Sequence, residues 1–213
     1  MKAVANIFPV MGKRYKRSDY ALVDLTRNNP ALRELPLDDL DQLEEYLEDY
    51  RKKWGAKLLW GGYGEKRYFY QASAHFGSRN IHLGVDIWAS EGTPVFAPLD
   101  GKLHSQAFND NYRDYGGTIL VEHDIYGQKW VSLYGHLSKA CLEWREPGAT
   151  IKAGEQIAEL GNPSENGGWI PHLHLQWIKG PIESFGDYPG VCNADEWQNY
   201  MELCPAPNML IFQ

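Results

Sequence analysis

A series of short strand-like runs after Gly64 constrains the fold more than any other feature of the sequence. These runs are rich in β-branched and aromatic residues, and turns that contain Asn, Asp or Gly separate them. They cover residues 67–71, 81–87, 95–98, 101–106, 118–123, 129–134, 156–160 and 172–178. Short strands joined by tight turns predict a mainly β fold with an antiparallel sheet at its core.

Two helices are expected beside this sheet. Apolar residues at positions 40, 43, 47, 50 and 54 recur every three or four residues and predict a helix over 38–54. Acidic residues crowd the start of this segment and basic residues its end, the order that a helix dipole favours. A short second helix is expected to start at Asn193, which forms a capping-box pattern with Glu196, and to stop before Cys204. Residues 1 to about 35 are interpreted as an irregular arm.

Charge and hydropathy argue against several classes of protein. The 213 residues include 21 Lys and Arg against 28 Asp and Glu, so a basic face for nucleic acid is not expected. No apolar run is long enough to predict an integral membrane segment, and the N-terminus lacks the pattern of a secretory signal. Three scattered cysteines favour buried free thiols in a reducing compartment. A cytoplasmic location is therefore predicted, with export by another route and the oligomeric state left open.

Two short motifs supply the residue types that bind zinc. His82 and Asp86 are four residues apart with a glycine between them, and His172 and His174 are two apart. In extended backbone these spacings place both side chains of each motif on one face. Three protein ligands with an open fourth position are typical of a catalytic zinc site, which leaves one of the last two histidines spare. That spare histidine and His136 could serve as a base and as a hydrogen-bond donor to an oxyanion.

These motifs and their neighbours resemble peptidase family M23, the LytM and lysostaphin type. The resemblance runs from about residue 81 to 177. Its motifs are His-Leu-Gly-Val-Asp at 82–86, Gly-Thr-Pro-Val at 92–95, Ala-Pro-Leu-Asp-Gly at 97–101, Tyr-Gly-His-Leu-Ser at 134–138, Gly154, Ile157 with Ala158, Gly161, and Pro-His-Leu-His at 171–174.

The resemblance implies a set of roles for these residues. His82, Asp86 and His174 would bind Zn²⁺, while His136 would take a proton from the water and His172 would donate to the oxyanion. The implied reaction is hydrolysis of a peptide bond, commonly in bacterial cell-wall peptides, on a β-rich fold. The chain then divides into an N-terminal arm and helical extension (1–77), an M23-type core (78–180) and a C-terminal extension (181–213), packed as one domain with wrapping flanks.

The flanks are similar to those of an M23-like module that lies between a kinase-like phosphotransferase domain and a class III aminotransferase domain in some multidomain proteins. Segments 63–67, 164–169, 190–191 and 203–208 carry this similarity. It implies a cytosolic setting and leaves two alternatives open, a hydrolase of a small amide metabolite and a non-catalytic zinc-binding regulatory module. The expected partner is a peptide or a small amide.

Aromatic residues near the motifs are candidates for a substrate cleft. We expect Trp169, Tyr112 and Tyr115 to line it, with residues 108–117 as an extended loop at its edge. His75 could border the cleft. His104 and His123 are expected to have surface or hydrogen-bonding roles.

Overall fold

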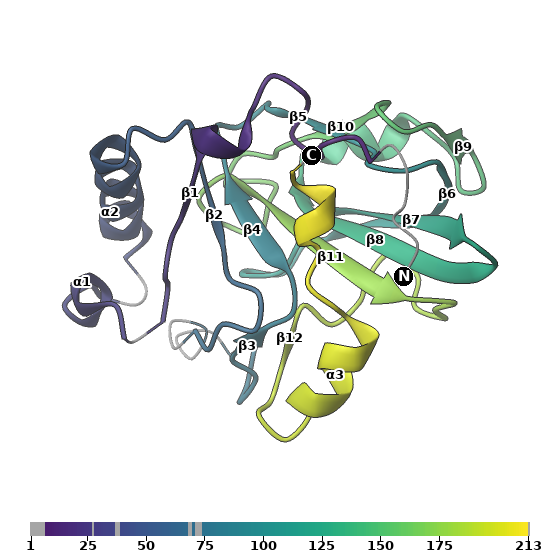
Figure 1. Cartoon of the computed structure of the whole chain (residues 1–213). Coiled ribbons are helices and arrows are strands. Elements are labelled where there is room, and N and C mark those ends of the chain that lie inside the picture. The colour runs from purple at the N-terminus through teal and green to yellow at the C-terminus, as the bar shows by residue number, and fades with distance from the viewer. Residues whose placement is uncertain (1–6, 27, 37–38, 68–69, 71–73, 213) are drawn as a thin grey trace.

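The computed structural model describes residues 7–26, 28–36, 39–67, 70 and 74–212. Its centre is a twisted eight-stranded sheet (Figure 1). In spatial order the strands are β1 (Tyr20–Leu22), β2 (Leu58–Gly61), β4 (Val85–Trp88), β11 (His172–Lys179), β8 (Gln128–Leu137), β7 (Gly116–Ile125), β6 (Gly101–Asn109) and β9 (Thr150–Ile151). Every neighbouring pair is antiparallel except β1 and β2, which confirms a mainly β fold with an antiparallel core.

Two smaller strand pairs complete the β structure. They are β5 (Pro94–Phe96) with β10 (Gln156–Glu159) and β3 (Ile81–His82) with β12 (Val191–Cys192), both antiparallel. The predicted run 81–87 is therefore two strands. Its first part pairs with β12 and its second with β2 and β11, so the chain changes sheets at Leu83 and Gly84.

Apolar side chains cover both faces of the central strands. On β11, Leu173, Leu175 and Trp177 enter the main apolar cluster, together with residues of β4, β5, β7 and β10. The alternate positions face the other side, where Ile178 packs with residues of β7, β8 and the C-terminal segment. His172 and His174 lie on this second face, because successive side chains of a strand point in opposite directions.

Two of the helices lie beside the edge of the sheet that β1 and β2 form (Figure 1). Helix α2 (Leu40–Lys53) begins after Asp39, which accepts a 3.1 Å hydrogen bond from the Gln42 amide, and Trp54 is its C-cap. This confirms the helix predicted over 38–54. With the short α1 (Pro30–Arg33) it packs against β2 through an apolar cluster that includes Leu47 and Leu59. Among the described residues, no helix has the length and apolar character that a membrane crossing requires.

Three local predictions need correction. Residues 1 to about 35 are not a wholly irregular arm, because within the described part β1 pairs in parallel with β2 and α1 follows. Helix α3 (Trp197–Leu203) starts after Glu196, whose side chain accepts the Asn193 amide at 2.9 Å in a turn that precedes the helix. The expected loop over 108–117 is short, because β6 and β7 stay paired as far as Asn109 and Gly116.

The end of helix α3 and the state of the cysteines agree with the predictions, whereas one predicted strand is only partly described. Helix α3 ends before Cys204, as predicted, and the three cysteines are buried free thiols. Part of the expected strand over 67–71 lies outside the described residues. Short 3-10 helices complete the secondary structure at Arg17–Asp19, Lys139–Glu143 and Asn208–Leu210.

Candidate metal centre

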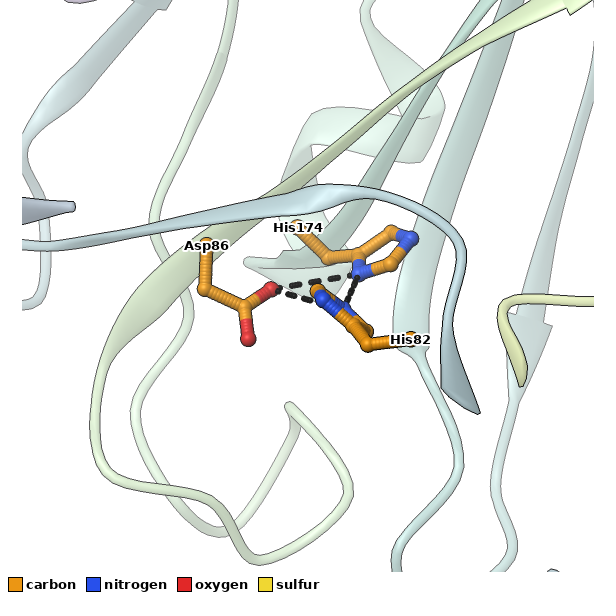
Figure 2. A group of neighbouring side chains, drawn as sticks. All are labelled: His82, Asp86 and His174. Atoms are coloured by element: carbon orange, nitrogen blue, oxygen red, sulfur yellow. Dashed lines mark hydrogen bonds and ion pairs between the residues drawn. The ribbon is translucent and has the colours of Figure 1, made fainter. Parts of the chain in front are cut away.

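Three donor side chains from three strands meet at one point (Figure 2). His82 ends β3, Asp86 lies on β4 and His174 lies on β11, where it is paired directly opposite Asp86. Gly84 allows the close approach, because a Cβ there would lie 2.6 Å from His174 Cε1 and 2.7 Å from the Leu175 carbonyl oxygen. All three donor residues are almost fully buried, with 1–3% of their surface exposed.

The spacing of the donor atoms fits a tetrahedral metal ion. His82 Nε2 lies 2.9 Å from His174 Nδ1 and 3.3 Å from Asp86 Oδ1, and His174 Nδ1 lies 3.2 Å from the same oxygen. Zinc bonds of 2.0–2.2 Å in tetrahedral geometry place donors about 3.3–3.6 Å apart. The three atoms are therefore at nearly the right separations, and two imidazoles with one carboxylate are donors that zinc commonly takes.

Hydrogen bonds to the far ring nitrogens set the tautomers of both histidines. His82 Nδ1 donates to the Gly62 carbonyl at 3.0 Å, so Nε2 is the unprotonated nitrogen and carries the lone pair. His174 is held the opposite way, since Nε2 donates to Gln176 Oε1 at 3.2 Å and leaves Nδ1 free. Gln176 is fixed in turn, because its amide nitrogen donates to the Pro189 carbonyl at 3.1 Å. Such outer partners orient metal ligands and raise their basicity.

The Asp86 carboxylate is kept ionised by its surroundings. Burial alone raises the pKa of this group, but His82 and Arg67 outweigh burial and hold the pKa well below the usual 3.8. The Arg67 guanidinium hydrogen-bonds Oδ2, while Oδ1 faces the two imidazoles. An ionised acid with one oxygen turned toward two lone pairs is suited to receive a cation.

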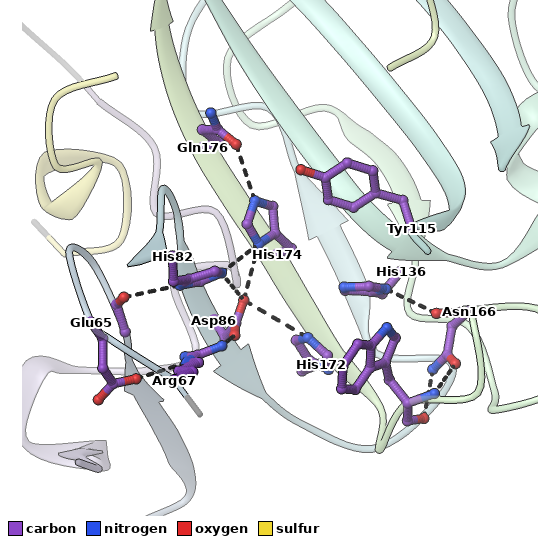
Figure 3. A network of polar contacts seen from close by, with 12 residues as sticks. Glu65, Arg67, His82, Asp86, Tyr115, His136, Asn166, His172, His174 and Gln176 are labelled. Atoms are coloured by element: carbon purple, nitrogen blue, oxygen red, sulfur yellow. Dashed lines mark hydrogen bonds and ion pairs between the residues drawn. The ribbon is translucent and has the colours of Figure 1, made fainter. Parts of the chain in front are cut away.

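His136 and His172 lie beside the three donors (Figure 3), with ring centroids 4.3 Å apart. Each is 6% exposed, and each donates from Nδ1 to a backbone carbonyl, at Asn166 (2.9 Å) and Ile170 (2.7 Å) respectively. Both Nε2 atoms are therefore proton acceptors in the neutral state. His172 Nε2 lies 3.8 Å from Asp86 Oδ1, so a proton on His172 would face a carboxylate.

A backbone irregularity aims His136 at this site. Gly135 is paired with His174, and Tyr134 enters the main apolar cluster. Regular alternation would therefore point the side chain of His136 into that cluster, away from His174. His136 instead has φ +63°, and its amide donates to the Tyr115 carbonyl at 2.8 Å. A left-handed backbone at a residue other than glycine is uncommon and is often found at functional sites.

These five side chains line a cavity of about 170 Å³, and both aromatic and charged side chains complete its wall. Trp169 and Tyr115 line it, and so does His75. The cavity does not include Tyr112, which is 65% exposed and stacks on Arg113. The remaining histidines lie elsewhere, as predicted: His104 contacts Ser105, while His123 bonds the Asp100 carbonyl and Ser132.

Comparison with known proteins agrees with this geometry. Residues 80–184, close to half of the chain, match the family model described as peptidase family M23. This segment belongs to peptidase family M23. The resemblance noted in the sequence is thereby confirmed for the M23 segment (80–184), which contains both histidine motifs.

Two curated relatives match a part of the chain that is larger than the M23 segment or about equal to it. An uncharacterized metalloprotease of Haemophilus influenzae is 33% identical over 136 residues, which is 61% of this chain and 26% of the relative. Glycyl-glycine endopeptidase ALE-1 of Staphylococcus capitis is 37% identical over 95 residues, 45% of this chain and 24% of the relative. The chain thus spans about a quarter of the length of these M23 relatives. The lysostaphin catalytic domain from Staphylococcus simulans is 26% identical, with TM-score 0.40, over 56% of this chain and 80% of that structure.

Several residues around His82, Asp86 and His174 were not predicted as site residues. Glu65 and Arg67 lie outside the M23 segment, and only the general similarity of 63–67 to related modules drew attention to them. Gln176 follows the His-Leu-His motif at the next same-face position, a spacing that could have identified it. Asn166 acts through its backbone carbonyl, which a side-chain pattern cannot reveal.

The buried histidines predict that the metal-free M23 segment loses stability in acid. Burial, with Arg67 nearby, lowers the pKa of His82 to about 3 from 6.5, and burial also lowers the pKa values of His136 and His172. Below pH 6.5 the unfolded chain takes up protons that the folded chain resists. Each such histidine then costs up to about 1.4 kcal/mol per pH unit, between 6.5 and its folded pKa.

We expect the urea midpoint of chelator-treated protein to fall steadily between pH 7 and pH 5. The His104→Gln variant should show the same pH dependence, because His104 is half-buried and lies on β6, outside the cavity. A midpoint that does not change over this range would contradict the prediction.

Proposed function

We propose that this chain is a zinc-dependent hydrolase of the M23 endopeptidase type that cleaves a peptide or amide bond. The observation that carries the proposal is the convergence of His82 Nε2, Asp86 Oδ1 and His174 Nδ1, each with its other polar atom already bonded. Two more histidines present acceptor nitrogens at the same cavity. Bound zinc would polarise the scissile carbonyl and lower the pKa of a water molecule toward about 7.

His136 is assigned the role of general base. Its Nδ1 proton is committed to the Asn166 carbonyl, so Nε2 carries the lone pair that accepts a proton from the attacking water. Burial and the neighbouring His172 hold the pKa of His136 well below 6.5, which keeps the ring neutral and available at neutral pH. General base catalysis of this kind contributes about 10² to 10⁴ in rate.

His172 is assigned the role of donor to the oxyanion of the tetrahedral intermediate. Donation from Nε2 requires the protonated ring, because Nδ1 already donates to the Ile170 carbonyl. Burial lowers the pKa of His172 below 6.5 and Asp86 only partly opposes this effect, so the protonated ring that this role needs is the minor form at neutral pH. Since the rings of His136 and His172 are close together, a proton on one disfavours a proton on the other.

Cell-wall peptides are the first candidate substrates. Relatives of the M23 segment carry the names glycyl-glycine endopeptidase and peptidoglycan DD-endopeptidase. A short peptide or a small amide is the second candidate, since the aromatic side chains that line the cavity beside its histidines could contact such a substrate. The similarity of the flanks to a module of cytosolic multidomain proteins also supports this second candidate, together with the proposed cytoplasmic location.

The test is hydrolysis by zinc-loaded protein of three substrate sets: purified peptidoglycan sacculi, short glycine- and D-alanine-containing peptides, and small amides. We expect new primary amines from at least one set, and no release after chelation of the metal. The His136→Asn variant serves as the inactive control. Tightly bound zinc without hydrolysis of any substrate would contradict the enzymatic proposal and favour a regulatory zinc module.

A further inference from the structure

A buried chain of polar contacts runs from Leu25 to Asp86, and Figure 3 shows its part from Glu65 through Arg67 to Asp86. The Leu25 amide donates to Glu65 Oε1 at 2.7 Å, and Arg67 Nε donates to Glu65 Oε2 at 2.8 Å. Arg67 Nη1 then donates to Asp86 Oδ2 and, at 2.9 Å, to the Tyr70 hydroxyl. The side chains of Arg67 and Glu65 are only 2% and 9% exposed.

This chain of contacts acts on one oxygen of Asp86. Oδ2 receives the guanidinium, whereas Oδ1 lies 3.2–3.3 Å from the free ring nitrogens of His174 and His82. A carboxylate held in this way offers a single oxygen to a cation. If Oδ2 were released, the group could rotate or offer both oxygens, which would change the coordination number.

The charges indicate that the main effect of Arg67 is to orient the Asp86 carboxylate. A lone guanidinium beside a ligand would repel a divalent cation, but Glu65 makes an ion pair with Arg67 and offsets its charge. The flat guanidinium reaches Glu65 through Nε and Asp86 through Nη1 at the same time. A lysine ammonium lacks this fixed fork geometry.

We propose that Glu65 and Arg67 are a positioning pair for the metal ligand Asp86, so that a segment outside the M23 segment is part of the metal centre. The pair holds Asp86 Oδ2 and leaves Oδ1 to the metal. This inference rests on the proposed metal site at His82, Asp86 and His174. It adds that zinc affinity depends on Glu65 and Arg67, which precede the M23 segment.

The test compares zinc dissociation constants, measured by competition with a chromophoric chelator. Arg67→Met should weaken zinc binding by about 10- to 100-fold, the usual effect of losing an outer partner of a ligand. Since this change leaves Glu65 buried without its partner, the double variant Glu65→Gln with Arg67→Met is made as well. The substituted glutamine side chain is a neutral acceptor for the Leu25 amide, so the fold should persist while zinc binding stays weakened.

A control removes another Arg–Glu ion pair, which lies away from the site and is more exposed than Glu65–Arg67. Arg145 and Glu155 are 2.6 Å apart, and Arg145 also donates to the Gln156 carbonyl. The double variant Arg145→Met with Glu155→Gln should bind zinc within twofold of the parent protein. Circular dichroism and the urea midpoint verify that each variant is folded.

Two further measurements distinguish an effect of Arg67 on the orientation of Asp86 from an effect of its charge and from a general loss of stability. Arg67→Lys keeps the charge, and we expect its zinc affinity to remain at least tenfold below that of the parent. In the cobalt(II)-loaded protein, Arg67→Met should weaken the visible absorption bands, because an unheld Asp86 allows a higher coordination number.

If the folded Glu65–Arg67 double variant binds zinc within twofold of the parent, the positioning role is overturned and the proposed metal site still stands. Full recovery of affinity in Arg67→Lys would also overturn it, in favour of a charge effect. A parent protein that binds no zinc would overturn the proposed metal site and the positioning role together.

Discussion

The His174→Ala variant is expected to lose zinc. His174 supplies one of three converging donor atoms, and its Nδ1 lies within 3.2 Å of both other donors. Removing it leaves a buried carboxylate and one imidazole, fewer protein ligands than a stable zinc site uses. The loss of affinity should exceed the 10- to 100-fold that follows loss of an outer partner. Elemental analysis after dialysis against metal-free buffer measures the occupancy directly.

The control for this prediction is His104→Ala, which removes a histidine that lies outside the cavity. It should retain the zinc content of the parent protein. Folding of His174→Ala is checked by circular dichroism, so that loss of metal is not mistaken for loss of structure. Full zinc occupancy in a folded His174→Ala protein would show that the ligand assignment is wrong.

Replacing His136 is expected to separate metal binding from turnover. Its Nε2 is an acceptor at the cavity, and none of the three donor atoms belongs to it. The variant should therefore keep zinc, while kcat on a cleaved substrate falls by about 10² to 10⁴ and KM changes little. Zinc content and steady-state kinetics on the same preparation test both parts.

The choice of substituent matters at this position. At φ +63° an alanine is strained, whereas asparagine tolerates a left-handed backbone better. His136→Asn is therefore the primary variant, and His136→Ala is compared with it for stability. Turnover near the parent level in His136→Asn would rule out His136 as the base. Loss of zinc from the folded Asn variant would mean that His136 is a ligand.

Local patterns predicted most of the fold. Periodic apolar residues located helix α2, because a 14-residue amphipathic helix carries its own capping and charge signals. The long hairpin strands β6, β7 and β8 were also predicted, since each combines strand-forming residues with turns at its ends. Strands β1 and β2 were both missed, because three or four residues carry little pattern and the two strands pair across more than 30 residues.

The candidate site was also predicted unevenly. Spacing placed His172 and His174 on one strand face, and the family motif assigned His82 and Asp86 to the same metal. Tyr112 was included because it is aromatic and close in sequence, but its side chain is exposed outside the cavity. The contact of Arg67, itself paired with Glu65, with Asp86 could not be predicted, since it joins segments about 20 residues apart through side-chain packing.

The sequence by itself determined which residues are the candidates for the chemistry, because imidazole and carboxylate side chains in these motifs have few other uses in this combination. Only the tertiary structure decided how they meet. The β4–β11 register sets Asp86 opposite His174, and a left-handed backbone turns His136 toward them against the regular alternation of its strand. Such geometry depends on contacts between distant segments, so local patterns identify the donors and the packed sheet fixes their positions.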